Sequence, residues 1–387
     1  MHILFVTGEY PPLRGGVGAY TAELAQALAA IGTQVSVVTS TTARDDANLP
    51  MSSSVQCYPV IHRWDWVIGQ QIPVLARQIG ADWCHVQYQT AAFAMHPAIN
   101  FAPFWWRKVN RGMQVAWTYH DLLVPYLFPK AGARLRRWVT ERPAHSSHVV
   151  ITTNAGDYQQ LAAKGLSALY KIPIGSNIAL PKTPLVAPSV LRARLGYAPT
   201  ALLIGYFGFL NRSKGGLTLI HTLHRLVERG HDAHLRMIGE RVGASDPTNF
   251  SYLQEVEALI AAYGLTDRVR WTGHLDDAAV SENLLACDLL LLPYVDGASL
   301  RRGTLMAGLA HGCAIVTTTP QAPLPELVAG ADLWYVPPED PDAAAHAVAQ
   351  LAANPGLRSA LGEQAQRKSR QFTWPAIAQQ HLAAYGC

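Results

Sequence analysis

Residues 2–39 read HILFVTGEYPPLRGGVGAYTAELAQALAAIGTQVSVVT, and this stretch decides the fold that the sequence predicts. Residues 2–7 are apolar and favour a strand, which the following glycines and prolines break. From position 17, apolar residues recur at helical spacing up to Ile31, Gly32 ends the helix, and residues 34–39 form a second strand. A strand–helix–strand unit of this length indicates two parallel strands joined by a right-handed crossover.

The same alternation continues along the chain and restarts once. Further strands are expected at residues 84–86, 115–118 and 149–152. The segment 180–200 contains four prolines and no strand pattern, and we interpret it as a linker. Beyond it we expect strands at 201–207, 234–238, 269–272, 289–292 and 314–317, and helices at 216–229, 252–263, 278–286 and 304–311. The sequence therefore predicts an α/β protein with two doubly wound, Rossmann-like parallel-sheet domains that face a central cleft.

The composition supports two globular cores. The chain has 387 residues, of which 49% are apolar and 15% charged. Its net charge of +4 suits an anionic ligand and does not require nucleic acid, so we expect no nucleic-acid partner. We find neither a signal segment at the start nor an apolar run of about 18 residues, which favours a cytoplasmic protein, with attachment to the inner face of a membrane left open. The cysteines form no CxxC pair, so we expect reduced thiols rather than zinc ligands or disulfides: Cys57, Cys84, Cys287, Cys313 and Cys387.

Two loops of the first half follow strands, at the sheet edge where α/β proteins bind ligands. Gly15 and Gly16 stand at the start of the first helix, where free backbone N–H groups bind anions. The dinucleotide motif GxGxxG is absent, because Thr21 takes the place of its last glycine. His120 follows the strand 115–118 and is suited to a sugar hydroxyl or a phosphate. The alternatives are a tight turn without a ligand and an ordinary surface histidine.

Two loops of the second half carry basic residues. Residues 208–216, GFLNRSKGG, place Arg212 and Lys214 beside glycines at a helix start, which suits a diphosphate although it is no Walker A motif. In the loop DGASLRRGTL, Arg301 and Arg302 precede a helix whose dipole opposes them. If no carboxylate compensates this pair, it favours an anionic partner. The alternatives are a solvated basic turn and a positively charged helix entrance without a ligand.

Taken in order, these features resemble the retaining GT-B glycosyltransferases of family four. The likeness covers nearly the whole chain and rests on GEYPPLRGGVGAY, HVQYQ, HDL, IPIGSNI, GFLNRSKGG, WTGHL, CDLLLLPY and LAHGCAIVTTT. The resemblance implies a GT-B fold with an acceptor-binding domain at 1–182 and a nucleotide-sugar-binding domain at 183–371. It also implies a terminal helix in 372–387 that crosses back to the first domain.

The resemblance further implies a hexosyltransferase that uses a UDP- or GDP-sugar, retains the anomeric configuration, and needs no metal or other cofactor. The acceptor is a hydroxyl of a glycan, a lipid-linked molecule or a small molecule. The leaving diphosphate helps to deprotonate that hydroxyl, and cationic groups stabilise its charge. The expected catalytic residues are His120, Lys214, Arg301 and Arg302. The expected substrate-binding residues are Gly15, Gly16, Arg212, Gly273, His274, Leu275, Ser299, Leu300, Gly303 and Thr304. Asp276 and Asp277 open a helix and indicate capping rather than a metal site.

The sequence departs from the family pattern at three positions. Phe209 stands where the family usually has an arginine, and Ser299 and Ala307 stand where it usually has two glutamates. We expect the positive charge to come instead from three arginines: Arg212, Arg301 and Arg302. The missing carboxylates keep two alternatives open, a nucleotide-sugar-binding scaffold without catalysis and a GT-B nucleotide-sugar epimerase. A dehydrogenase is disfavoured by the absent glycine motif.

Residues 101–108 and 126–138 interleave aromatic and basic side chains. This mixture suits peripheral contact with a membrane surface or a lipid-linked acceptor. It equally suits a wall on which sugars stack, or a partly buried helix whose basic side chains reach solvent.

Overall fold

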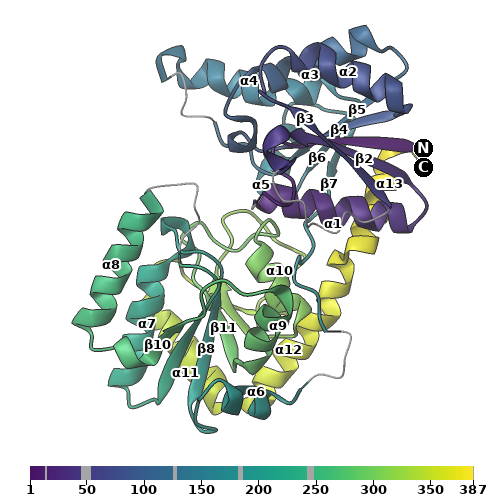
Figure 1. Cartoon of the computed structure of the whole chain (residues 1–387). Coiled ribbons are helices and arrows are strands. Elements are labelled where there is room, and N and C mark those ends of the chain that lie inside the picture. Colours follow the sequence, from purple (N-terminus) through teal and green to yellow (C-terminus); the bar gives the residue numbers. More distant parts are fainter. Residues whose placement is uncertain (14, 45–53, 125–128, 182–185, 242–247, 387) are drawn as a thin grey trace. The chain divides into compact units, whose positions relative to one another are not determined.

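The computed structural model describes residues 1–13, 15–44, 54–124, 129–181, 186–241 and 248–386, which divide into two compact α/β units (Figure 1). Unit 1 contains Met1–Asn177 and Thr373–Cys387, and unit 2 contains Ile178–Phe372. The boundaries expected from the sequence lie after residues 182 and 371.

Unit 1 is built on a parallel sheet, ordered β3-β2-β1-β4-β5-β6-β7 in the described residues. Its strands are β1 (His2–Val6), β2 (Gln34–Ser40), β3 (Val55–Ile61), β4 (Trp83–Tyr88), β5 (Gln114–Tyr119), β6 (Val149–Thr152) and β7 (Leu169–Lys171). Every residue of β1 is buried, as expected for an inner strand with helices on both faces of the sheet. The strand order reverses between β1 and β4, and ligands of doubly wound folds bind at such a reversal.

The helices of unit 1 cover both faces of this sheet. They are α1 (Gly16–Ala30), α2 (Ile68–Ile79), α3 (Ala98–Val109), α4 (Ala133–Ser146), α5 (Ala155–Ala162) and α13 (Trp374–Tyr385). Helices α2, α3 and α4 lie side by side on one face, and α1 packs with α13 on the other (Figure 1). The end of the chain thus belongs to unit 1, where Ile377 and Ala378 are fully buried.

Unit 2 repeats this architecture on a second parallel sheet, ordered β10-β9-β8-β11-β12-β13. Its strands are β8 (Leu202–Phe207), β9 (Ala233–Ile238), β10 (Val269–Trp271), β11 (Leu289–Leu292), β12 (Ile315–Thr318) and β13 (Trp334–Val336). Its helices are α6 (Pro188–Arg194), α7 (Gly216–Glu228), α8 (Thr248–Ala262), α9 (Asp277–Ala286), α10 (Gly303–Ala310), α11 (Pro341–Ala353) and α12 (Pro355–Ser369). The reversal lies between β8 and β11, so the loops after these two strands are the expected ligand-binding loops.

The predicted linker at 180–200 is wrong in its second part. Helix α6 lies within it, and Leu191 and Tyr197 are buried in a small core of unit 2. Pro188 does not prevent this helix, because it occupies a first-turn position whose N–H makes no helical hydrogen bond.

The structure describes only part of the chain on which the expectations about membrane-spanning segments and reduced cysteines rest. Among these residues, no helix combines the length and the apolar character that crossing a bilayer requires. Cys57, Cys84, Cys287 and Cys313 are free thiols. Cys387 and residues 126–128 lie outside the described residues.

Candidate functional site

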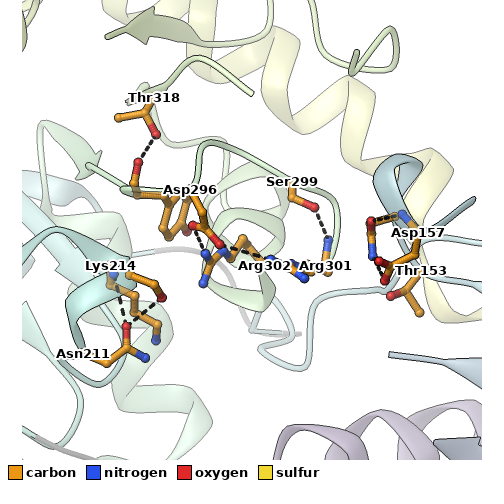
Figure 2. Close-up of polar contacts among 12 residues, drawn as sticks. Thr153, Asp157, Asn211, Lys214, Asp296, Ser299, Arg301, Arg302 and Thr318 are labelled. Atoms are coloured by element: carbon orange, nitrogen blue, oxygen red, sulfur yellow. Dashed lines mark hydrogen bonds and ion pairs between the residues drawn. The ribbon is translucent and has the colours of Figure 1, made fainter. Parts of the chain in front are cut away.

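The side chain of Lys214 lies against the backbone of Gly208, just beyond β8. The Asn211 side chain accepts a hydrogen bond from the backbone N–H of Lys214 (3.1 Å) and so fixes the short turn that carries it (Figure 2). A Cβ on Gly208 would lie 2.9 Å from Lys214 Nζ and 2.8 Å from Thr304 Cγ2. Because Gly208 has no side chain and a φ of 112°, it lets the ammonium group and α10 approach the end of the strand.

Arg301 and Arg302 share one carboxylate, that of Asp296 (Figure 2). The Nη2 atom of Arg301 lies 3.1 Å from Oδ2, and Arg302 pairs with Oδ1. The sequence predicts that the arginine pair favours an external anion unless a carboxylate compensates it. Asp296 supplies this carboxylate, so that argument does not hold. The signal was present in the sequence, since Asp296 precedes the pair in the same loop.

The region remains net cationic in spite of Asp296. In the described part of the chain, Arg301 and Arg302 both pair with Asp296, while the charged neighbour of Lys214 is the cation Arg302. Burial, and then the charge of Arg302, lower the pKa of Lys214 to about 8. Helix α10 begins directly after Arg302 without a side-chain cap, so its first N–H groups add positive potential. An anion bound here would relieve the repulsion between Lys214 and Arg302.

Arg302 is held by its ion pair with Asp296 and by an aromatic ring. Its guanidinium lies 4.7 Å from the centre of the Tyr294 ring, and its side chain is 13% exposed. The Nε atom of Arg302 is buried without a hydrogen-bond partner among the described residues. The hydroxyl of Tyr294 contacts Thr304 Oγ1 at 2.6 Å, which joins the predicted residue Thr304 to the same cluster. One N–H donor of Arg302 is therefore left to be satisfied.

Two predicted residues of unit 2 have other partners. Arg212 is exposed and pairs with Glu255 of α8 at 2.7 Å. His274 is also exposed, and its Nδ1 lies 3.5 Å from a carboxylate oxygen of Glu240. The partners of Arg212 and His274 are therefore different residues from the neighbours of Lys214.

The other residues of unit 2 that were predicted to bind substrate carry no charged side chain. Gly273 has a φ of 70° and forms an isolated bridge with Gly239, and Leu275 follows it, half-buried, two residues on. The Ser299 hydroxyl accepts a bond from the Arg301 N–H at 3.4 Å, and the side chain of Leu300 is buried. Gly303 is the exposed first residue of α10.

In unit 1, the predicted glycine loop contains a carboxylate that the sequence analysis missed. Gly16 opens α1, and a Cβ placed on it would meet no atom within 4 Å. Beside it, Glu9 Oε2 packs against Gly15 and is buried without a hydrogen-bond partner among the described residues. Burial raises the pKa of Glu9. The backbone N–H of Gly18 hydrogen-bonds this carboxylate, and its second oxygen Oε2, which has no partner in the described part of the chain, is suited to a hydroxyl donor.

His120 is placed by a neighbour on the adjacent strand. Its Nε2 donates to Oε1 of Gln87 at 3.0 Å, and its ring meets that of Tyr20 edge-on at 4.7 Å. Burial, and then the nearby His381, lower the pKa of His120 to about 3. The ring is therefore neutral at physiological pH, and its Nδ1 is the hydrogen-bond acceptor.

A buried polar network lies behind His120. The amide nitrogen of Gln87 lies 3.4 Å from His85 Nε2, and His85 Nδ1 contacts the hydroxyl of Tyr385. Tyr20 in turn lies 3.4 Å from His381 Nε2. Tyr385 and His381 come from α13, so the last helix of the chain completes the surroundings of His120. Alternation along HVQ, which places His85 and Gln87 on one side of β4, was the available sequence signal.

Family models match most of both units. Residues 14–179 match the family model described as Glycosyltransferase Family 4, and residues 201–354 match that described as Glycosyl transferases group 1. The chain belongs to the group 1 glycosyltransferases of family 4.

Relatives of this family 4 protein are about a quarter identical to it over the residues that match. It is 25% identical to the phosphatidyl-myo-inositol mannosyltransferase of Mycobacterium leprae over 96% of this chain and 92% of that protein. It is 27% identical to the D-inositol 3-phosphate glycosyltransferase of Actinosynnema mirum over 50% of this chain. That match spans 46% of the Actinosynnema protein, about half of its length.

Solved structures establish that the fold is GT-B. Sucrose-phosphate synthase from Thermosynechococcus elongatus superposes with a TM-score of 0.76 at 20% identity, covering 100% of this chain and 98% of that one. The Anabaena protein HepE in complex with UDP gives a TM-score of 0.76 at 18% identity, with 100% of both chains covered.

Two of the positions at which this glycosyltransferase departs from the family pattern, Ala307 and Phe209, differ in burial. Ala307 is fully buried in α10, so the second glutamate position presents no polar group. Phe209 is 44% exposed, and its ring centre lies 5.9 Å from Lys214 Nζ. An aromatic face thus stands beside the ammonium group where the family has a second cation.

Proposed function

We propose that this protein transfers a sugar from a nucleoside-diphosphate sugar to an acceptor hydroxyl, with retention of anomeric configuration and without a metal. The observation that carries the proposal is the position of Lys214 beside Gly208 and near the charge of Arg302, which directly precedes α10. This arrangement offers two cations and unsatisfied N–H groups to one anion. A diphosphate leaving group is the anion that family membership makes most relevant.

In this mechanism the protein stabilises charge rather than supplying a nucleophile. Lys214, Arg302 and the N–H groups of α10 bind the diphosphate as the bond to the sugar breaks. The departing oxygen accepts the proton of the acceptor hydroxyl, which attacks from the same face. His120 of unit 1 accepts a hydrogen bond from a donor-sugar hydroxyl through Nδ1, and Glu9 orients the acceptor.

The names of the similar proteins suggest which donors and acceptors to test. HepE was solved with UDP, and two relatives are named for D-inositol 3-phosphate and phosphatidyl-myo-inositol. We therefore propose a UDP- or GDP-sugar as donor. For the acceptor we propose a glycan or a lipid-linked molecule with a free hydroxyl.

The test is nucleoside diphosphate release from a panel of UDP-, GDP- and ADP-sugars with and without the inositol acceptors. We expect release with one base, unchanged by EDTA, and a product whose anomeric proton coupling matches that of the donor. Lys214→Met is expected to lower kcat at least a hundredfold, since one donor to a transition-state oxyanion contributes about that much. Arg225→Met, on α7 and paired with Glu228 and Asp342, is the matched control. An inverted product or complete inhibition by EDTA would refute the mechanism.

The absent carboxylates at Ser299 and Ala307 favour one second candidate, a nucleotide-sugar-binding protein without catalysis. The same cationic cluster would bind the diphosphate, and no turnover would follow. Calorimetric binding of a nucleotide-sugar, combined with no diphosphate release for any acceptor on the panel, would select this alternative.

A further inference from the structure

The helical layer formed by α2, α3 and α4 carries an unbalanced positive charge. These helices contain seven basic residues: Arg77, Arg107, Lys108, Arg134, Arg136, Arg137 and Arg142. Their single acidic residue is Glu141, which is buried and pairs with Lys164 at 2.5 Å. The whole chain has nearly equal numbers of basic and acidic residues, 31 and 27, so this layer concentrates the excess.

Aromatic side chains form two groups on the same layer, and Arg142 lies over a ring of each. Trp66, Trp105 and Trp138 are 57%, 47% and 50% exposed. The Phe101 ring joins two of them, with its centre 5.7 Å from that of Trp66 and 6.2 Å from that of Trp138. Phe104 contacts Trp105 with ring centres 5.4 Å apart. We call these five aromatic residues and the seven basic residues the α2–α4 surface, after the helices that carry most of them.

Cationic side chains lie directly over these rings. The Arg142 guanidinium is 4.9 Å from the centre of the Phe101 ring and 5.1 Å from that of Trp138. The Lys108 ammonium lies 4.2 Å from the centre of the Phe104 ring. Tryptophan rings interleaved with basic side chains are typical of the level at which lipid headgroups meet acyl chains.

A basic pocket opens at one end of this surface. It has a volume of about 470 Å³ and is lined by Phe104, Arg107, Lys108, Arg111, Met113, His145, Ser146 and His148. No carboxylate belongs to this lining. Arg107 donates to the carbonyl of Ser146 at 3.2 Å, which fixes one wall of the pocket. The pocket therefore suits a phosphoryl anion.

We propose that the α2–α4 surface docks on a bilayer containing anionic phospholipid, with the tryptophans at headgroup level and a headgroup phosphate in the basic pocket. Charge complementarity identifies the partner as anionic. The exposed apolar side chains Val67, Val109 and Leu135 favour a lipid over a hydrated polyanion, because a bilayer surface removes them from water. This docking is independent of the proposed transferase activity.

The test is sedimentation of the full chain with vesicles of phosphatidylcholine containing 30% phosphatidylglycerol or none. We expect binding to the anionic vesicles alone and its loss in 1 M NaCl. The triple variant Arg107→Gln, Lys108→Gln, Arg111→Gln is expected to bind about a hundredfold more weakly, roughly fivefold per charge. The double variant Trp105→Ser, Trp138→Ser is expected to bind at least tenfold more weakly.

The matched controls lie in unit 2. The variant Arg225→Gln, Arg229→Gln, Arg367→Gln removes three exposed charges, and Phe250→Ser removes an exposed aromatic ring. Both are expected to bind vesicles as the unmodified chain does, and circular dichroism checks that every variant is folded. Absence of vesicle binding at low salt, or equal loss in the controls, overturns the proposal. The proposal is also overturned if heparin or RNA displaces the vesicles and binds equally well to the chain with and without the two tryptophan substitutions. That result would assign the surface to a polyanion.

Discussion

The ammonium group of Lys214 lies next to the Cα of Gly208, so that a Cβ on Gly208 would stand 2.9 Å from Nζ. The variant Gly208→Ala should push Lys214 and Thr304 away from the end of β8. We expect a loss of about 1–3 kcal/mol in the free energy of unfolding, because φ is 112° and the space is filled. Calorimetry should show at least tenfold weaker nucleoside diphosphate binding.

Gly230→Ala separates backbone strain from displacement of Lys214. Gly230 also has a positive φ, 83°, but a Cβ there would meet no atom within 4 Å. This variant should lose stability while binding the diphosphate normally. Equal weakening in both variants would mean that Lys214 is not part of the site.

The lowered pKa of Lys214 predicts how diphosphate binding changes with pH. Below pH 8 the ammonium is charged in the free protein and binding is strongest. Above its pKa of about 8, the free protein must take up a proton to bind, so Kd should rise by up to tenfold per pH unit. Lys214→Arg should abolish this dependence, since arginine keeps its charge. A Kd that rises equally in both proteins would contradict the assignment.

Removing the carboxylate that Arg301 and Arg302 share should lower the stability of the protein and raise its affinity for an anion. In Asp296→Asn the two arginines lose their ion pair. We expect a cost of about 1–2 kcal/mol, less than for a fully buried pair, because the Asp296 side chain is 30% exposed. Diphosphate binding should tighten, and the melting temperature should rise more on addition of ligand than in the unmodified protein. Weaker diphosphate binding in this variant would indicate that Asp296 orients the arginines for the ligand.

The contact between Gln87 and His120 should fix the histidine tautomer. In Gln87→Leu the donor Nε2–H of His120 loses its acceptor, so the two neutral tautomers should both become populated. We expect kcat to fall about tenfold with little change in KM for the donor. Nitrogen-15 NMR of the His120 ring checks the tautomer directly, and a spectrum identical to that of the unmodified protein would disprove the role of Gln87.

The repeated alternation of strand and helix patterns in the sequence allowed the fold to be predicted. Apolar runs such as that of β1 and the helical spacing in α1 are local signals, and local signals suffice for parallel α/β units. Short edge strands such as β7 and β13 were missed, because three residues carry too little pattern. The Asp276 cap was local as well: its side chain accepts from the Ala279 N–H at 2.8 Å, which confirms the capping interpretation.

The sequence by itself determined the fold class, the family and the loops at which Gly16, His120, Lys214 and Arg302 lie, because each follows from periodicity or a motif within a few neighbouring residues. The folded chain buries the Glu9 Oε2 atom beside Gly15 without a partner among the described residues, and brings His381 from the last helix to Tyr20 and so to the surroundings of His120. Tyr20 and His381 are 361 positions apart, and packing of α13 against α1 brings them together. Charge compensation and burial set the pKa of a side chain, and both depend on neighbours that only the folded chain supplies.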